Sequence, residues 1–354
     1  MDFVFNFAMN NLKDFTMKAI DIIKTRQLEW AKRIIGKENL NKDYPFYCKE
    51  VENNIFCDKD SKGLSNIVEA QIRRGSGNEL KDGDTEPAKM KALFSSSALC
   101  VNVFQYFAIG NENKVLDFLK ACKLISNNYQ GDVIPVDFEY ENKNKNIQVP
   151  IRFEEKFETG IPYGVPNLDA VIRTKSKTGK KQLFAFESKF TEPYSSSHRG
   201  NFLKEKYCSE SKIWSYNGCD IYKALNIDNK ENICRLIKKD GKEEWEEGRY
   251  IFDYKYLDGA QLVKHILGAT NSLKNNIEEK NTEITLVYLW YDAFGTEGDM
   301  HREEIEDFRK TIEDATSQKI KVRHATYQEI ICNLCKRLGD SHRDYLNYIT
   351  ERYL

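Results

Sequence analysis

Alternating apolar and polar positions predict a β-hairpin near the middle of the chain. Residues 168–173 and 182–190 are short runs rich in β-forming side chains, and the polar segment between them contains one glycine, Gly179. Glycine supplies the positive φ that a tight hairpin loop needs. A further strand is expected upstream, over residues 149–157. The pattern thus predicts three consecutive strands.

Periodic apolar positions predict alternating helices and strands after the hairpin, and helices before it. Downstream, helices are expected over residues 258–273, 301–316, 327–338 and 343–353, and strands over residues 284–291 and 319–323. Upstream, helices are expected over residues 12–35, 65–73, 87–108 and 113–125. We therefore expect an α/β fold in which a mixed β-sheet is flanked by helices.

The loop length of the hairpin decides which side chains face each other. Side chains alternate across a strand, so Glu187 and Lys189 share one face and Ser188 points away. A three-residue loop at residues 177–179 sets Asp169 opposite Glu187, whereas a two-residue loop sets it opposite Ser188. Apolar residues before Glu187 indicate a central strand. Charged side chains are rarely buried in such a strand unless they are paired or have a function. We expect the three-residue loop, or a bulge that restores the same pairing.

These polar residues suit metal-assisted phosphodiester chemistry. The carboxylates of Asp169 and Glu187 are hard oxygen ligands for Mg²⁺, with Mn²⁺ as a substitute, and the Ser188 carbonyl adds a backbone ligand. Such a metal lowers the pKa of a bound water and offsets charge that develops on the phosphate. Lys189 orients or deprotonates the water, and its charge stabilises the transition state.

In strand order, Asp169, Glu187 and Lys189 resemble the motif of the PD-(D/E)xK nuclease superfamily, which includes many restriction endonucleases. Pro166 stands three residues before Asp169, where the motif places an adjacent proline. The wider sequence from about residue 75 to residue 290 is similar to a bacterial group of restriction endonucleases within that superfamily. The resemblance implies a restriction-endonuclease-like sheet and Mg²⁺-dependent hydrolysis of DNA, with a role in defence.

The resemblance also implies a domain organisation and partners. The nuclease domain is expected over residues 65–338, with an insertion at about 193–256, an N-terminal helical region at 1–64 and a C-terminal helix at 339–354. Cleavage of both DNA strands is easiest for a homodimer, and a companion methyltransferase is the expected partner of a restriction enzyme.

Two further catalytic residues are expected from the same resemblance. Glu79 follows Gly-Ser-Gly-Asn, which resembles a motif in related restriction enzymes, and it is our choice for an additional acid. Glu155 and Glu69 are its rivals. Gln261, at the start of the helix after the hairpin, resembles a glutamine of exonuclease-like members, and His265 lies one turn further on the same side.

A polar stretch directly after the hairpin is the candidate DNA-binding segment. Ser197, His198 and Arg199 offer a hydroxyl, an imidazole and a guanidinium, and Lys204 extends the patch. Such groups contact DNA phosphates. A solvated loop is the competing interpretation for each of these residues.

Composition narrows the function further. The formal net charge of -1 gives no global basic field, so any DNA binding depends on local patches. No segment approaches the ~20 apolar residues of a membrane span, so no membrane partner is expected. The nine cysteines are interpreted as reduced thiols of a cytoplasmic protein. Cys332 and Cys335 form a lone pair without a second pair at zinc-site spacing, which favours core packing.

Three functions therefore compete. The first is a metal-dependent DNA endonuclease, for restriction or defence. The second is an exonuclease-like or structure-selective DNA-processing nuclease, which Gln261 favours. The third is a non-catalytic nucleic-acid-binding module on the same fold, against which the intact acids and lysine argue. An RNA substrate stays open, because nothing in the sequence identifies a group that reads a 2′-hydroxyl.

Overall fold

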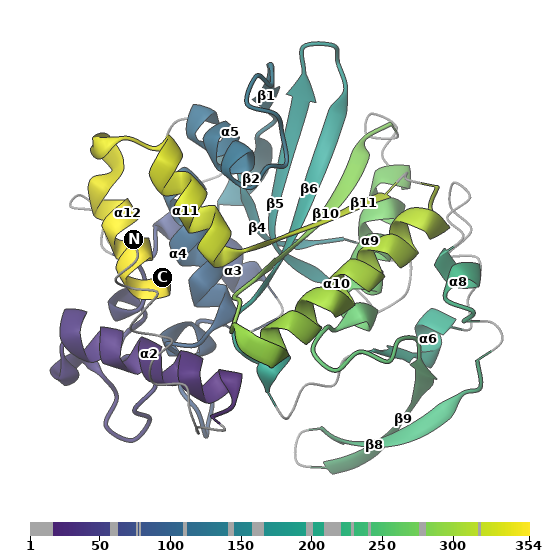
Figure 1. Ribbon diagram of the computed structural model, residues 1–354, viewed down its shortest axis with the longest axis horizontal. Coiled ribbons are helices and arrows are strands. Elements are labelled where there is room, and N and C mark those ends of the chain that lie inside the picture. The colour runs from purple at the N-terminus through teal and green to yellow at the C-terminus, as the bar shows by residue number, and fades with distance from the viewer. Residues whose placement is uncertain are drawn as a thin grey trace.

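In the computed structural model the chain forms a central β-sheet surrounded by helices (Figure 1). The model describes residues 17–56, 63–75, 77, 79–108, 112–140, 145–157, 166–195, 201–208, 221–227, 230–239, 242–275, 281–317 and 320–354. Among these residues, no helix is both long enough and apolar enough to cross a membrane.

A six-stranded mixed sheet forms the centre of the molecule. Its strands are β1 (Gly131–Val133), β4 (Arg152–Lys156), β5 (Asn167–Ser176), β6 (Lys181–Lys189), β10 (Glu283–Trp290) and β11 (Ile320–Thr326). The order is β1-β5-β6-β10-β11, and β4 pairs with β5 beside β1. Strand β5 is antiparallel to its three neighbours, whereas β6, β10 and β11 are parallel to one another. This arrangement makes β6 a central strand, as its apolar sequence predicts.

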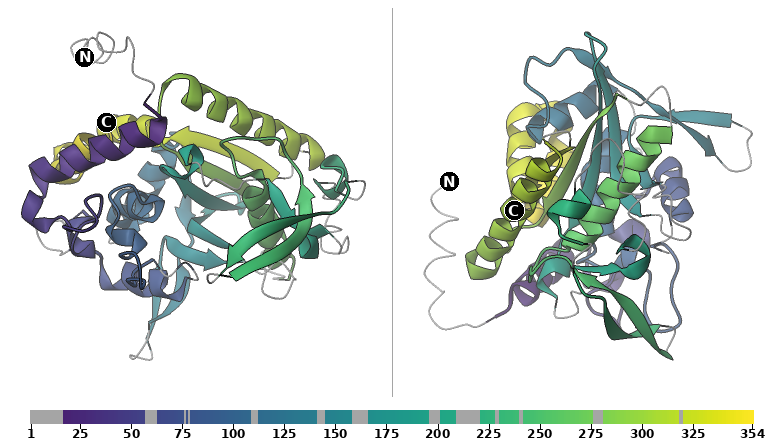
Figure 2. Two further views of the ribbon diagram at one scale, coloured as in Figure 1. Left: turned by 90° about the horizontal axis from the view of Figure 1, so that it is seen from below. Right: turned by 90° about the vertical axis from the view of Figure 1, so that its right-hand side faces the viewer.

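Helices cover both faces of this sheet (Figures 1 and 2). On one face lie α9 (Gly259–Asn275) and α10 (Gly295–Ala315). The other face carries α2 (Ala19–Ile34), α3 (Asn66–Arg74), α4 (Ser96–Ala108), α5 (Glu112–Ala121), α11 (Tyr327–Arg337) and α12 (Arg343–Tyr353). The predicted α/β class with a mixed, helix-flanked sheet is thus confirmed.

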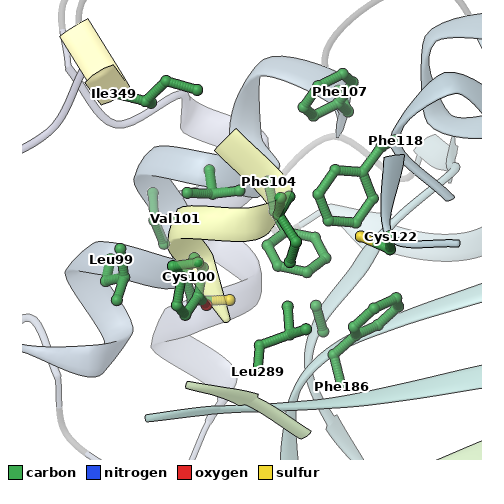
Figure 3. Packing of buried hydrophobic residues seen from close by; sticks show 14 of the residues in the cluster. Leu99, Cys100, Val101, Phe104, Phe107, Phe118, Cys122, Phe186, Leu289 and Ile349 are labelled. Carbon is green, nitrogen blue, oxygen red and sulfur yellow. The ribbon is translucent and has the colours of Figure 1, made fainter. Parts of the chain in front are cut away.

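Aromatic side chains fill the layer between α4, α5 and the sheet (Figure 3). The Phe104 ring lies 4.6 Å from the Phe118 ring and 5.1 Å from the Phe186 ring, measured between centroids. All three side chains are fully buried. Burying a side chain of this size stabilises a fold by about 1.5–3 kcal/mol, so this cluster anchors β6 close to its functional end.

Smaller elements surround the central layers. A hairpin is formed by β2 (Val136–Tyr140) and β3 (Lys145–Val149), and a three-stranded sheet by β7 (Phe202–Lys204), β9 (Lys242–Tyr250) and β8 (Ile233–Lys239). Two short helices, α6 (Glu205–Cys208) and α8 (Ile221–Ala224), lie near that sheet. Single 3-10 turns occur at Lys37–Asn39, Val51–Asn53, Lys89–Lys91, Glu192–Tyr194 and Asp340–His342. In Figure 1 the β8–β9 hairpin projects from the body of the protein.

The predicted helix from Pro87 is wrong in its first half. Residues 89–91 form only a 3-10 turn, and α4 begins at Ser96. The side-chain amide of Asn54 donates hydrogen bonds to the carbonyls of Met90 and Ala92, at 2.8 and 2.9 Å, and thereby takes acceptors that a helix would use. The Ser95 hydroxyl then accepts a hydrogen bond from Ala98 N and starts α4.

Other boundaries and one burial prediction also differ from the sequence expectation. The expected strand over 149–157 is divided between β3 and β4, and the hairpin strand β2 was not expected. Helix α10 starts at Gly295, earlier than predicted, whereas α5 ends at Ala121. Cys332 and Cys335 are exposed, so their predicted packing in the core is wrong.

Candidate active site

The hairpin turn has the predicted length. Ser176 N donates to the Lys180 carbonyl at 2.9 Å, and Gly179 N donates to the Ser176 carbonyl at 2.9 Å. These bonds close a three-residue loop in which Gly179 has a φ of 87°. The strand pairing runs from Lys175 opposite Lys181 to Ala170 opposite Phe186. One further step in this register aligns residues 169 and 187, as the loop length predicts.

Strand β5 is irregular where Asp169 stands. Leu168 and Val171 belong to the same buried cluster, although strict alternation would put residues three apart on opposite faces. Asp169 Oδ2 accepts a 2.6 Å hydrogen bond from Ser188 N. On the next strand, Glu154 has a φ of 50°, a conformation that non-glycine residues rarely adopt. The backbone is therefore distorted around both acids, as is common where side chains are aimed at a site.

Glu187 and Lys189 form a close pair on β6. Lys189 Nζ lies 2.6 Å from Glu187 Oε1. On the other carboxylate oxygen, Oε2, His265 Nε2 lies at 3.0 Å, without the alignment of a hydrogen bond. Glu187 and His265 are each 2% exposed. Two basic groups thus flank one buried carboxylate.

The candidate residues surround a common cavity of about 380 Å³. It is lined by Gly77, Glu79, Lys89, Ser96, Ser97, Glu154, Pro166, Asn167, Asp169, Glu187, Ser188, Lys189, Glu192, Gln261, Lys264 and His265. All five predicted catalytic residues, Asp169, Glu187, Lys189, Glu79 and Gln261, are among them. Residues 90 or more positions apart in the sequence therefore meet at one end of the hairpin.

The structure places Glu79, and neither of its rivals, at the cavity. Glu79 is 8% exposed, and its carboxylate accepts hydrogen bonds from Lys89 Nζ at 3.0 Å and from Ser97 Oγ at 3.1 Å. Glu155 instead pairs with Arg173 at 2.6 Å, and Glu69 pairs with its helix neighbour Arg73. Neither rival lines the cavity.

Glu154 is a cavity acid that the sequence interpretation missed. Its Oε2 accepts a 3.1 Å hydrogen bond from the Asn167 side chain. Burial raises the pKa of Glu154 to about 7, and Glu79 adds to the rise. Glu154 and Glu155 are neighbours on one strand, so their side chains diverge, and the sequence pattern did not tell which of them faces the site.

The helix α9 adds Lys264 to the cavity, which the sequence interpretation also missed. Burial lowers the pKa of Lys264, and the nearby Lys204 lowers it further. Gln261, Lys264 and His265 are spaced three and four residues apart, which places them on one helix face. That spacing was a usable signal, because a helix that follows the hairpin must pack beside it.

The pKa values of the two hairpin carboxylates, Asp169 and Glu187, are shifted in opposite directions. Burial acts to raise the pKa of Glu187, but Lys189 and His265 oppose it and bring the pKa down to about 2. For Asp169, burial raises the pKa well above its usual range, and Glu187 and Glu154 add to the rise. The surroundings therefore favour the ionised form of Glu187 and disfavour that of Asp169, and a cation beside Asp169 would favour its ionised form.

A second groove, of about 460 Å³, adjoins the cavity and shares seven lining residues with it: Glu79, Lys89, Ser96, Ser97, Lys189, Glu192 and Gln261. On its far side it reaches Lys24 of α2, whose Nζ lies 4.2 Å from the centre of the Phe94 ring. The groove also passes the first residues of α4, Ser96 and Ser97. The hydroxyls and lysines of this groove suit a phosphate backbone, whereas Glu79, Glu192 and Asp258 on the same groove would repel it.

The predicted DNA-binding segment gains little support. Ser197, His198 and Arg199 lie outside the described residues. Lys204 is on β7, where its Nζ forms a 2.6 Å ion pair with Glu246. It lines neither the cavity nor the groove. Lys204 is thus the one candidate of the four whose position is described, and its charge is paired with Glu246.

The donor set fits a hard divalent cation that keeps several waters. Asp169 and Glu187 supply carboxylate oxygens, and Glu79 and Glu154 are further acids on the cavity wall. In the described part of the chain, no three His, Cys, Asp or Glu side chains converge at the spacing of a bound metal. The residues thus suit Mg²⁺ held by one or two carboxylates, and they do not form a closed structural metal site.

A family model matches nearly the whole chain. It is described as Restriction Endonuclease associating with ARP, and it matches residues 24–354. No curated protein and no solved structure matches the chain. The matched region includes the hairpin, α9 and the helices on both faces of the sheet. The chain therefore belongs to the family of restriction endonucleases associating with ARP.

Proposed function

We propose that this protein is a metal-dependent DNA endonuclease of the PD-(D/E)xK type, with Mg²⁺ as cofactor and Mn²⁺ as a substitute. The observation that carries the proposal is the meeting of Asp169, Glu187 and Lys189 around one cavity at the end of the hairpin. The restriction-endonuclease family of the chain supports DNA as the substrate and defence as the role.

In this proposal Asp169, Glu187 and the Ser188 carbonyl hold the cation. Bound there, Mg²⁺ would supply a water of lowered pKa and offset charge on the phosphate. Lys189 Nζ, 2.6 Å from Glu187 Oε1, is placed to orient that water and to stabilise the developing charge. Glu79 and Glu154 complete the negative wall of the cavity, and the second groove guides the DNA strand.

A restriction role also carries two expected partners. One active site per chain cuts one strand at a time, so cleavage of both strands is simplest for a two-fold homodimer. A companion methyltransferase would protect host DNA. The family description adds an association with ARP, which we propose as a further partner of this chain.

An exonuclease-like activity is the second candidate. The observation that favours it is the position of Gln261, which lines both the cavity and the second groove. The two candidates differ in whether they need a DNA end.

The test compares covalently closed circular DNA with linear DNA of the same sequence, each with Mg²⁺, Mn²⁺ or EDTA. An endonuclease nicks or linearises the circle only when a divalent cation is present. Degradation of linear DNA beside an intact circle would favour the exonuclease-like candidate. Protein that binds DNA and cleaves neither form with either cation would contradict both.

A further inference from the structure

His265 is a buried histidine whose two ring nitrogens make no hydrogen bond to the part of the chain that the structure describes. It is 2% exposed, and neither Nδ1 nor Nε2 has a hydrogen-bond partner among the described residues. An unsatisfied buried polar atom costs about 1–3 kcal/mol, so such a group needs a compensating role. The Glu187 carboxylate lies beside it, with Oε2 at 3.0 Å from Nε2.

Close helix packing brings His265 to this position. Gly268, three residues further along α9, lies against Phe157, which follows β4, and Pro166, which precedes β5. A Cβ at Gly268 would approach Phe157 Cβ to 3.0 Å and Pro166 Cγ to 3.1 Å, closer than nine in ten such contacts. The missing side chain therefore lets α9 approach the end of the hairpin, where the imidazole reaches Glu187.

The two oxygens of Glu187 have different neighbours. Lys189 occupies Oε1 at 2.6 Å, and His265 stands beside Oε2 at 3.0 Å. In the proposed nuclease the Glu187 carboxylate must present an oxygen to the cation while Lys189 serves the water. A carboxylate held by Lys189 alone would be free to turn once that lysine engages the water. A partner on Oε2 prevents this rotation.

We propose that His265 is a positioning residue that fixes the Glu187 carboxylate for metal binding by donating from Nε2 to Oε2. This inference rests on the proposed function. A small rotation of the ring completes the hydrogen bond and satisfies Nε2. Partners of this kind, behind a metal ligand, typically contribute 10–100-fold to metal affinity. The competing interpretation is a histidine that only fills the core, and it predicts a loss of stability without a change in metal affinity.

The experiment measures Mn²⁺ and Mg²⁺ binding to the full chain by calorimetry, and thermal unfolding in EDTA. His265→Leu removes the donor, and His265→Gln retains an amide nitrogen at a similar reach. Thr270→Val on the same helix is the packing control, because Thr270 is buried and bonds to Ile266 O outside both cavities.

We expect His265→Leu to bind both cations about 10–100-fold more weakly, and His265→Gln to recover most of that loss. Thr270→Val should lower the melting temperature and leave metal binding unchanged. If the leucine variant does not fold, His265→Asn replaces it, because its amide is too short to reach Glu187.

Three results would overturn the inference. Unchanged metal affinity in His265→Leu would make the residue a core histidine. A loss confined to Mn²⁺ would make it a direct ligand. If the wild-type protein binds neither cation, both the proposed metal site and this inference are rejected. If the wild-type protein binds metal and His265→Leu binds it with the same affinity, only this inference is rejected.

Discussion

Lys189 Nζ and Glu187 Oε1 lie 2.6 Å apart on one face of a central strand. Because of this short distance, the lysine would compete with the proposed cation for the same carboxylate. In the proposed nuclease the lysine would both act on the attacking water and hold Glu187 when no cation is present. Because of this double role, a substitution of Lys189 can change catalysis and metal binding in different directions.

Lys189→Ala should strongly reduce the rate of cleavage without weakening metal binding. Loss of an electrostatic contributor of this kind lowers turnover by about 10²–10³-fold. Because the competing ammonium is gone, Mn²⁺ affinity should stay the same or rise. Single-turnover cleavage and calorimetric Mn²⁺ titration measure the two effects. A variant that cleaves DNA at the wild-type rate would remove Lys189 from the chemistry.

The raised pKa of Glu154 predicts a pH-dependent stability of the metal-free protein. The folded state keeps this proton up to about pH 7, whereas the ordinary pKa of the group is 4.5. Between these values the folded state binds more protons than the unfolded state, so stability falls as the pH rises. Glu154→Gln should remove this fall, so that its stability relative to wild type rises by about 3 kcal/mol between pH 4.5 and pH 8.

Urea unfolding in EDTA at several pH values measures that gain. Glu155→Gln is the matched control, since it changes the adjacent acid and removes an ion pair with Arg173 instead. A gain of the same size in Glu155→Gln would show that Glu154 is not the source.

Lys24→Glu should weaken DNA binding, because Lys24 lines the far end of the second groove. One lost phosphate contact and one added negative charge predict an affinity about 3–10-fold lower at low salt, with a shallower salt dependence. Lys32→Glu on the same helix is the control. Lys32 pairs with Glu29 and lines neither cavity nor groove. Fluorescence anisotropy with duplex DNA at several salt concentrations decides between a DNA path through this groove and one elsewhere.

Gly179→Ala should cost stability and leave the chemistry unchanged. Its φ of 87° strains a residue that carries a Cβ, although no atom lies within 4 Å of the added carbon. The free energy of unfolding should fall by about 1 kcal/mol. Cleavage per folded molecule should equal that of wild type, because the turn lies at the end of the hairpin remote from Asp169. A large loss of specific activity would instead indicate that alanine shifts the strand register.

Local signals predicted much of the fold and the centre of the site. The polar segment with its one glycine predicted the hairpin, the functional interpretation of Asp169 and Glu187 selected its register, and the apolar run before Glu187 predicted a central strand. Periodic apolar positions predicted the helices α9, α11 and α12. Each of these features depends on residues close together in the sequence, which is why the pattern reveals it.

Long-range contacts account for what the sequence did not reveal. The amide of Asn54 binds the carbonyls of Met90 and Ala92 and prevents a helix there, across more than 30 residues. The unusual φ of Glu154 arises where β4 meets β5. The approach of His265 to Glu187 depends on the packing of α9. The first two of these relationships have no periodic or motif signature, whereas the helix spacing of Gln261 and His265 is a local one.

The most direct test of the account is cleavage of supercoiled plasmid by three proteins: wild type, Asp169→Asn and Asp132→Asn. Asp132 is an exposed acid on β1 of the same sheet, opposite Lys175, and it controls for the loss of one carboxylate. We predict that wild type and Asp132→Asn nick or linearise the plasmid with Mg²⁺ and not with EDTA, and that Asp169→Asn does neither. Cleavage by Asp169→Asn at the wild-type rate, or cleavage that survives EDTA, would contradict the proposed active site.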